Sequence, residues 1–561
     1  SVLQIGGTVS MTMIWAGAQN DASDGVSRVD AWWRGAVIYQ IYPRSFFDSN
    51  GDGVGDLPGI CAKLEHVASL GVDAIWLCPF FTSPMKDFGY DVADHLAVDP
   101  VFGTMADFDR LLALAHALGL YVLIDQVWSH TSSHHPWFLD SRTRDGGRRD
   151  WYVWADPRGD GTPPNNWLSV FGGAAWSWEP RRRQFYLHHF LASQPALNLR
   201  RPEVVDAILA SGRFWLDRGV DGFRLDAIDF MTHDPELRSN PPASALPGAP
   251  VPAKLFGLQD HIHDMLNPAT FAVLGRIRAL VDEYPGAATL GEVSSQPGAY
   301  DRVLAYTEGV ERLHMAYTLR PLRCGLDHAT LSDMLAEAAA AGEDGWPCWS
   351  FSNHDVERAV SRWNPHRGRA APDPRFARLL MALLLSLRGS VCLYQGEELG
   401  LTEPELGPEA MRDPFGVAYW PEFRGRDGSR TPMPWHPDRP HGGFTEGDTP
   451  WLPVPTEHAA LAVAAQEADP EALLHAWRAF LAFRRASPAL TRGALAMLDL
   501  PEPCVGFMRS EGTERVLCLF NLSDAPQIAA PGLPDAPPEV PLGPYGAWVE
   551  VLSAREAAAA A

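Results

Sequence analysis

The alternation of short apolar runs with longer amphipathic segments is the feature that most constrains how this chain can fold. Eight runs rich in β-branched and aromatic residues lie between residues 36 and 395, and segments with apolar residues at intervals of three and four separate them. This alternation is typical of βα units around a parallel sheet, and eight units predict a closed (β/α)8 barrel. The predicted strands span residues 36–46, 71–79, 121–130, 219–227, 289–294, 313–319, 348–355 and 391–395.

Three segments rich in turn residues do not fit the repeat. We predict a catalytic barrel over residues 31–130 and 202–490, with a small inserted domain B at 131–201 and a C-terminal antiparallel β-sandwich domain at 491–561. Within the barrel domain, residues 399–455 follow the eighth strand and are expected to cover the mouth as a lid-like insertion. Residues 1–30 are interpreted as an N-terminal extension of the kind that an expression vector can add.

Composition narrows the partners of the chain. A formal net charge of -23 argues against nucleic acid and anionic membranes, while 20 Trp suit a flat, neutral ligand such as a sugar. Seven scattered cysteines indicate neither a disulfide framework nor a zinc site. Because the chain has no apolar run of membrane-spanning length and no secretory signal pattern, we expect a cytoplasmic protein. We further expect a monomer or homodimer that needs no organic cofactor.

Three acidic residues stand at or near the ends of predicted strands. Asp226 ends the fourth strand, Glu292 lies near the end of the fifth and Asp355 ends the seventh. Each of them alone would more often be an ordinary surface acid. The C-terminal strand ends of such a barrel share one mouth, however, so the three carboxylates are expected to meet there. Cleaving a glycosidic bond with retention requires a carboxylate nucleophile and a carboxylic acid, and a third carboxylate can stabilise the cationic transition state.

The runs DGFRLDA, LGEVS, FSNHD and DQVWSH resemble the four signature regions of the α-amylase family of glycoside hydrolases (family 13). The match extends from about Trp32 to the end of the chain, and GYD, QPALN and GRDGSRTPMPW resemble the oligo-1,6-glucosidase and α-glucosidase branch. This resemblance implies that Asp226 is the nucleophile, Glu292 the general acid/base and Asp355 the transition-state stabiliser.

The resemblance also implies a pocket for one glucose. Asp87 and Tyr90 would grip and stack the non-reducing glucose, and Arg426 would pair with Asp87 and close the pocket, which makes the enzyme exo-acting. Arg224 lies two residues before Asp226 on the same strand face, so its charge is expected to keep Asp226 ionised. The full predicted substrate-binding set is Asp87, Tyr90, His130, Phe171, Phe190, Gln194, Arg224, His354 and Arg426.

The loop after the first strand predicts a structural cation. It places oxygen-bearing residues at every second position, with glycines for the tight turns, much like the first part of an EF-hand loop. The alternative is a metal-free turn rich in Asp and Asn. The predicted ligands of the Ca²⁺ or Mg²⁺ ion are Asp48, Asn50, Asp52, Asp56 and the carbonyl of Val54.

Two positions depart from the family pattern, and a third indicates which linkage is preferred. Ser129 replaces an asparagine that binds calcium in many amylases, so no second ion is predicted, and Ala196 replaces the aspartate of QPDLN. Ala227, after the nucleophile, is valine in α-1,6-specific relatives and alanine or threonine in α-1,4-specific ones, so we expect an α-1,4 preference.

The predicted function is an exo-acting, retaining α-glucosidase that acts on small α-glucosides such as maltose, with transglucosylation. The alternatives are a glucosyltransferase or an isomerase of sucrose or trehalose, and an oligo-1,6-glucosidase. A non-catalytic amylase-like scaffold is disfavoured because all three acids are present.

Overall fold

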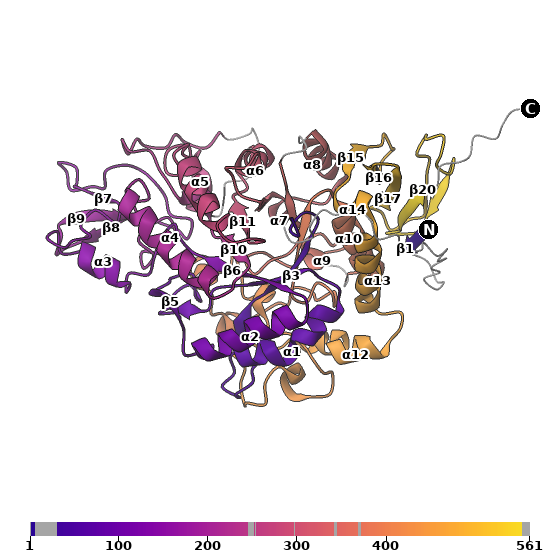
Figure 1. Ribbon diagram of the computed structural model, residues 1–561, viewed down its shortest axis with the longest axis horizontal. Coiled ribbons are helices and arrows are strands. Elements are labelled where there is room, and N and C mark those ends of the chain that lie inside the picture. Colours follow the sequence, from indigo (N-terminus) through magenta and orange to yellow (C-terminus); the bar gives the residue numbers. More distant parts are fainter. Residues whose placement is uncertain are drawn as a thin grey trace, which may run out of the picture.

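The computed structural model describes residues 2–5, 31–244, 252, 254–296, 298–340, 345–367 and 372–552. At its centre eight parallel strands lie in the order β12-β11-β10-β6-β3-β2-β14-β13. A parallel bridge between Ala316 and Pro347 joins the two ends of this order, so the sheet closes into the predicted barrel (Figure 1). The strands are β2 (Val37–Ile41), β3 (Ala74–Leu77), β6 (Tyr121–Gln126), β10 (Gly222–Leu225), β11 (Ala288–Val293), β12 (Met315–Thr318), β13 (Cys348–Ser350) and β14 (Ser390–Tyr394).

The barrel strands are nearly continuous apolar runs because both of their faces are covered. Every residue of β2, β3 and β14 is buried, as expected where helices pack outside a parallel sheet and side chains fill its interior. Alternate residues point inward, and Trp76 of β3 and Tyr317 of β12 belong to one interior cluster.

Three of the helices between the strands, α1 (Leu57–Ser69), α2 (Met105–Ala117) and α10 (Pro374–Ser386), begin at side-chain caps. Thr104 and Asp107 form a capping box at the start of α2. Asp56 caps α1 and Asp373 caps α10 through their side chains. The other helices around the barrel are α4 (Pro202–Asp217), α5 (Thr270–Val281), α6 (Ala299–Thr307) and α8 (His328–Ala340).

Residues 131–201 follow β6 and form a separate small layer at one end of the molecule (Figure 1). Helix α3 (Pro136–Ser141) precedes a three-stranded antiparallel sheet of β7 (Trp154–Ala155), β9 (Gln184–Leu187) and β8 (Trp176–Glu179). The rings of Trp167 and Trp176 stack at 5.9 Å in its own apolar core.

Two loops bring residues to the C-terminal end of the barrel. Asp87 and Tyr90 lie between β4 (Phe81–Thr82) and β5 (Asp94–Val98). Residues 399–455 follow β14 and contain α11 (Pro414–Tyr419). In that segment a Cβ on Gly416 would lie 2.8 Å from the Cα of Gly425, so these two positions approach too closely for side chains. This close approach fixes the backbone next to Arg426.

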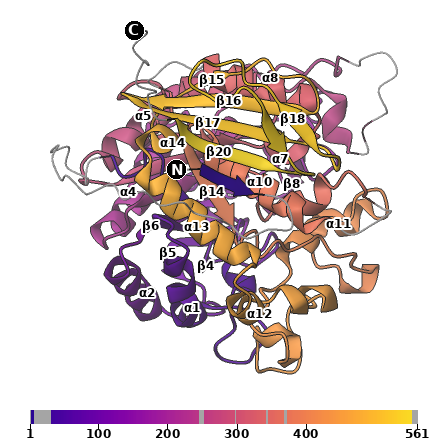
Figure 2. The same cartoon turned by 90° about the vertical axis from the view of Figure 1, so that its right-hand side faces the viewer.

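The C-terminal part of the chain is antiparallel, as predicted (Figure 2). One sheet has the order β1-β20-β17-β16-β15, and β18 pairs with β19. Strand β1 (Val2–Ile5) pairs with β20, and the remaining residues 6–30 of the predicted extension lie outside the described residues. In the described ranges, no helix is long and apolar enough to cross a membrane. The elements are α12 (Val463–Ala468), α13 (Leu473–Ala486), α14 (Pro488–Thr491), β15 (Ala494–Met497), β16 (Cys504–Glu511), β17 (Glu514–Asn521), β18 (Gln527–Ala529), β19 (Val540–Leu542) and β20 (Ala547–Leu552).

Candidate active site

The C-terminal ends of the barrel strands open into a cavity of about 1660 Å³. Asp226, Glu292 and Asp355 all line it, from the ends of β10 and β11 and from the loop after β13. Only 8% of Asp226 and 8% of Glu292 is exposed. The structure therefore brings together the three acids that the sequence singled out. The predicted substrate residues that also line the cavity are Asp87, Tyr90, His130, Phe171, Phe190, Gln194 and Arg426.

Arg224 lies beneath the cavity and connects two of its acids. Its Nη1 donates a hydrogen bond to Asp226 Oδ1 at 2.6 Å, and its Nη2 contacts the carboxylate of Glu292. Burial alone would lower the pKa of Arg224, but the neighbouring carboxylates hold it well above its ordinary value. The guanidinium therefore stays charged, and the predicted pair of Arg224 with Asp226 is present with Glu292 as an additional partner.

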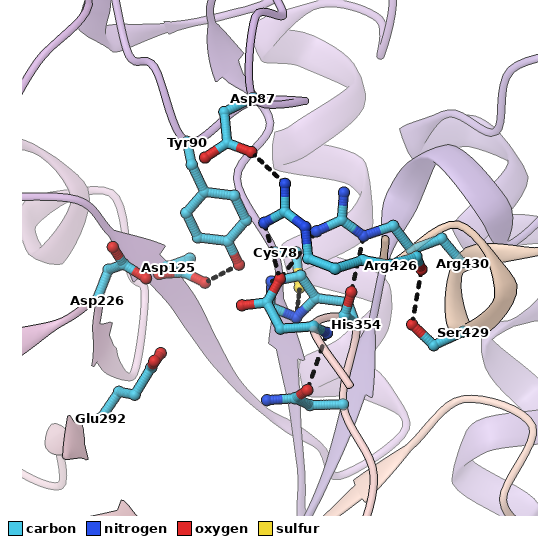
Figure 3. Close-up of polar contacts among 12 residues, drawn as sticks. Cys78, Asp87, Tyr90, Asp125, Asp226, Glu292, His354, Arg426, Ser429 and Arg430 are labelled. Atoms are coloured by element: carbon cyan, nitrogen blue, oxygen red, sulfur yellow. Dashed lines mark hydrogen bonds and ion pairs between the residues drawn. The ribbon is translucent and has the colours of Figure 1, made fainter. Parts of the chain in front are cut away.

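Asp125, near the end of β6, is a fourth carboxylate under the site and has no solvent exposure. Arg224 Nη1 donates to both of its oxygens, at 2.8 and 3.1 Å. Tyr90 and Trp76 each donate to Asp125 Oδ2 at 3.1 Å. Asp125 thereby positions Arg224 below Asp226 and, as Figure 3 shows, contacts Tyr90 of the pocket wall.

Arg426 contacts both Asp87, which is predicted to bind glucose, and Asp355. Its Nη2 lies 2.7 Å from Asp87 Oδ1 and its Nη1 lies 3.1 Å from Asp355 Oδ1. In Figure 3, Arg426 lies on one side of Tyr90, whereas Asp226 lies on the other. Burial raises the pKa of Asp87 to about 6, although the charge of Arg426 opposes that shift. This end of the pocket therefore presents carboxylate acceptors and guanidinium donors, which suit sugar hydroxyls.

Asp413 holds Arg426 from a second direction. Its carboxylate accepts hydrogen bonds from Nε of Arg426 at 3.0 Å, from Nη2 at 2.7 Å and from the backbone N–H at 2.8 Å. Burial would raise the pKa of Asp413, but Arg426 and Arg430 lower it to about 2. Asp413 also caps α11 by accepting from the N–H of Phe415. One buried carboxylate thus positions both the arginine and the start of the helix beside it.

Arg430 is a second cation on Asp355. Its Nη2 donates to Asp355 Oδ1 at 2.8 Å, and its Nε donates to the carbonyl oxygen of His354 at 2.7 Å. Burial would raise the pKa of Asp355, but His354, Arg426 and Arg430 together lower it far below its ordinary value. Asp355 therefore keeps a negative charge at the cavity, which a transition-state stabiliser requires.

His354 was predicted to bind glucose, yet it lies behind the cavity wall with no solvent exposure. Its ring is stacked between those of Tyr42 and Tyr90, with centroids 5.6 and 5.1 Å away. Burial lowers its pKa to about 3, so the ring is neutral at physiological pH. Its Nδ1 lies 2.8 Å from Gln40 Nε2 and its Nε2 lies 3.5 Å from Asp355 Oδ1. In this arrangement His354 supports the wall from behind.

His130 lines the cavity and is part of a polar chain. Its Nε2 lies 3.0 Å from the carbonyl oxygen of Tyr90 and 3.3 Å from Nε2 of Gln194, which in turn donates to Asp87 Oδ2 at 3.1 Å. Its Nδ1 lies 2.9 Å from the hydroxyl of Ser129. Ser129, at the position of an asparagine in many amylases, thus contacts the pocket histidine.

Aromatic rings and one alanine form the remaining wall. The ring centroids of Phe171 and Phe190 are 5.8 Å apart, and Phe190 also contacts Phe230 at 5.2 Å. Ala227, directly after Asp226, has a φ of 46°, in the left-handed region that residues other than glycine rarely adopt. A β-branched residue would be strained at this position.

The predicted cation loop forms consecutive turns. Asp48 Oδ1 accepts from the N–H of Asn50, Asn50 Oδ1 from that of Asp52, and Asp52 Oδ1 from that of Val54. Within the described ranges, no group of three or more His, Cys, Asp or Glu side chains is arranged to hold a metal ion. The predicted donors are all oxygen atoms, as a hard cation requires, and the cation stays a prediction.

Four residues of the site are not among those predicted from the sequence. They are Asp125, Tyr317, Asp413 and Arg430. Asp413 and Arg430 lie within 13 residues of Arg426 in the sequence, so the density of charge around that arginine was an available signal. Tyr317 donates to Glu292 Oε2 at 3.1 Å and accepts from Arg224 Nη2 at 2.8 Å, but a tyrosine in an apolar strand looks like any core residue.

Sequence comparison places this site among known enzymes. Residues 40–493 match the family described as alpha amylase, catalytic domain. The chain is 52% identical over 532 residues to a probable alpha-glucosidase of Rhizobium meliloti (strain 1021), covering 93% of this chain and 94% of the relative. It is 34% identical over 521 residues to an oligo-1,6-glucosidase of Parageobacillus thermoglucosidasius, covering 88% and 91%.

Two solved structures match this chain over most of its length. An alpha-glucosyl transfer enzyme matches with a TM-score of 0.89 at 51% identity, covering 93% of this chain and 100% of the other. A trehalose-6-phosphate hydrolase of Bacillus licheniformis matches with a TM-score of 0.83 at 28% identity and the same coverage.

Proposed function

The chain belongs to the α-amylase family of glycoside hydrolases, with relatives named alpha-glucosidase and oligo-1,6-glucosidase, and on this premise we propose that it is an exo-acting, retaining α-glucosidase. It releases α-glucose from the non-reducing end of short α-glucosides and prefers maltose-like α-1,4 bonds. The observation that carries this proposal is the contact of Arg426 with both Asp87 and Asp355. This contact supports the proposal because it links Asp87, proposed to bind glucose, to Asp355, proposed to act in catalysis.

The proposed reaction is a double displacement. Asp226 attacks the anomeric carbon while Glu292 gives its proton to the glycosidic oxygen, so the aglycone leaves and a glucosyl-enzyme ester forms. Glu292 then takes a proton from water, which attacks the same carbon and frees Asp226. Asp355 stabilises the positive charge that develops on the sugar in both steps. The buried Arg224 donates a hydrogen bond to Asp226 Oδ1, which supports the proposed nucleophile by orienting its carboxylate.

The exo mode is supported by the polar groups at the end of the pocket. Asp87 is linked to Arg426 on one side and to Gln194 on the other. These contacts fill the space into which a longer glucan would extend beyond its non-reducing glucose. The fourth hydroxyl of that glucose is therefore expected to meet Asp87 and Arg426, and internal bonds of a long chain are not cleaved.

The α-1,4 preference is supported by the small side chain of Ala227, which lines the cavity next to Asp226. Its left-handed backbone leaves little tolerance for a β-branched residue. A small side chain at this position leaves room for the sugar that follows an α-1,4 bond.

Glucosyl transfer to sugar or alcohol hydroxyls is the second candidate activity. The apolar cluster of Ala227, Phe230 and Met265 also lines the cavity, and such a surface holds an acceptor that competes with water for the glucosyl-enzyme. The name of the alpha-glucosyl transfer enzyme, 51% identical to this chain, favours this addition.

A substrate panel with product identification tests the proposal. We expect glucose from maltose at a higher kcat/KM than from isomaltose, and α-glucosyl products when an alcohol is added. Maltotriitol should yield glucose and maltitol, because cleavage starts at the non-reducing end. Isomerised sucrose or trehalose as the main product would instead identify an isomerase. Full activity of Asp226→Ala, compared with the surface control Asp109→Asn, would refute the mechanism.

A further inference from the structure

Lys254 and Arg323 differ from the other cations that line the active-site cavity. Arg362 and Arg378 donate to backbone carbonyl oxygens, and Arg367, Arg424 and Arg426 pair with carboxylates, whereas Lys254 and Arg323 have neither kind of partner among the described residues. Lys254 belongs to the segment between β10 and α5, and Arg323 is the last residue of the short helix α7 (Arg320–Arg323), which follows β12. Both side chains line the cavity. In the part of the chain that the structure describes, no Asp or Glu lies within ion-pair distance of either. This arrangement is unusual in a chain with a net charge of -23 and three lysines, because acids are abundant and easily placed nearby.

Lys254 is held in the cavity by aromatic rings. Its Nζ lies 3.7 Å from the ring centroid of Phe423 and 4.2 Å from that of Phe415. The rings attract the cation but provide no counter-charge. Burial, followed by the charges of Arg323 and Arg426, lowers the pKa of Lys254 to about 8, so it is mostly charged at pH 7. The neighbouring residues 245–253 contain no Asp or Glu.

Arg323 lies on the side of the cavity where the leaving group must sit. Its Nη1 donates to the hydroxyl of Ser295 at 3.4 Å, and Ser295 follows Glu292 by three residues. Because the general acid gives its proton to the leaving oxygen, the aglycone occupies the side of the cavity next to Glu292. Arg323 is exposed to solvent, yet the protein atoms around its side chain lower its pKa. Both properties are expected of a side chain that lies in an open cavity.

The acids whose charges act on Lys254 and Arg323 are already bound by other arginines. Asp355 and Asp413 influence the charge of Lys254, but Arg426 binds both of them and Arg430 binds Asp355 as well. Two like charges that face one cavity repel each other, so an incoming anion would relieve the repulsion as well as form new charge-assisted hydrogen bonds.

We propose that Lys254 and Arg323 form a binding site for a negatively charged group on the aglycone, so that the enzyme favours α-glucosides whose leaving group carries a phosphate or a carboxylate. This inference rests on the proposed function and specifies the substrate class of the same site. The glucose half of the substrate binds at Asp87 and Arg426, and the oxyanion binds at Lys254 and Arg323, near Phe423 and Ser295. The acceptor of a transfer reaction would occupy the same position and is expected to show the same preference.

Binding to the Asp226→Asn variant tests this without turnover. Isothermal titration calorimetry at low ionic strength compares two matched pairs: maltose with and without a phosphate on O6 of the reducing glucose, and 4-carboxyphenyl against 4-carbamoylphenyl α-glucoside. We expect Kd to be about tenfold lower for the charged member of at least one pair. The pair that responds identifies phosphate or carboxylate as the natural group, and the preference should shrink at high salt.

Variants assign the preference to the two cations. Lys254→Met and Arg323→Gln, each in the Asp226→Asn background, should reduce the preference at least threefold. Arg424→Gln is the matched control, because Arg424 lines the same cavity but is paired with Glu405, and it should retain the preference. Equal Kd values within both pairs, or a preference that neither variant reduces, would overturn the inference. Failure of the parent enzyme to hydrolyse any neutral α-glucoside would instead contradict the proposed function and leave these Kd values valid.

Discussion

Nη2 of Arg426 lies 2.7 Å from Oδ1 of Asp87, although 339 residues separate them in the sequence. One residue belongs to the loop between β4 and β5, and the other to the long segment after β14. The pocket proposed to bind glucose therefore depends on the packing of two loops from distant parts of the chain. Substitutions that weaken the packing of either loop are therefore expected to change substrate binding in this pocket.

Asp413→Asn is predicted to weaken both the fold and substrate binding. Removing one charge from a buried, hydrogen-bonded pair costs about 3 kcal/mol, and Arg426 becomes free to move away from Asp87. We expect a lower free energy of unfolding in urea and at least a tenfold higher KM for maltose. Because the pKa of Asp413 is lowered to about 2, its contribution to stability is present above pH 4 and is lost as the pH falls towards 2. An unchanged KM would show that Arg426 does not need this partner.

Asp87 is predicted to set the acid limb of the pH profile. Its pKa is raised to about 6, so kcat/KM for maltose should fall as the pH drops through that value and Asp87 becomes protonated. A raised carboxyl pKa also means that the stability contributed by this group declines as the pH rises from about 4 to about 6. Asp87→Asn should therefore raise Tm at pH 7 while lowering kcat/KM at least 100-fold. A lower Tm in this variant would contradict the assignment.

Ala227 is predicted to govern linkage preference. Valine at a φ of 46° is strained by about 1–3 kcal/mol, and its extra methyl groups narrow the cavity beside Asp226. Ala227→Val should lower Tm and reduce the ratio of kcat/KM for maltose to that for isomaltose. Ala227→Gly is the matched control, since glycine tolerates this backbone, and it should keep the maltose preference. An unchanged ratio in the valine variant would separate this position from specificity.

The loop of residues 48–56 is predicted to bind Ca²⁺ or Mg²⁺ for stability only. Removal of the ion with EDTA should lower Tm by several degrees, because binding to the folded state alone stabilises it, and added Ca²⁺ or Mg²⁺ should restore Tm. Asp52→Ala, which removes an exposed predicted ligand, should not respond to EDTA. Equal Tm values with and without EDTA in the parent would favour a metal-free turn.

The barrel could be predicted because its strands are buried on both faces. Runs such as AIWL of β3 and VIYQI of β2 carry their burial in their own composition, and the acids near the strand ends then share one mouth by the geometry of the fold. The resemblance added the pairing of Arg426 with Asp87, a contact that no local pattern contains.

The contacts beneath the cavity could not be predicted in the same way. Asp125 and Tyr317 belong to the site because Arg224 contacts both of them inside the barrel. The spacing of these residues along the sequence does not indicate that they are in contact. For His354 the resemblance implies contact with glucose, which stays a prediction, whereas the stacking of its ring between two tyrosines has no signal in the sequence.

The anomeric form of the first product tests the central claim most directly. Proton NMR during early hydrolysis of phenyl α-glucoside, whose only sugar product is the glucose of the non-reducing end, distinguishes release of α-glucose from release of β-glucose before mutarotation. Double displacement at Asp226 predicts that the α anomer accumulates first and that the equilibrium mixture appears later. Initial accumulation of the β anomer would mean a single displacement by water and would contradict the assignment of Asp226 as nucleophile.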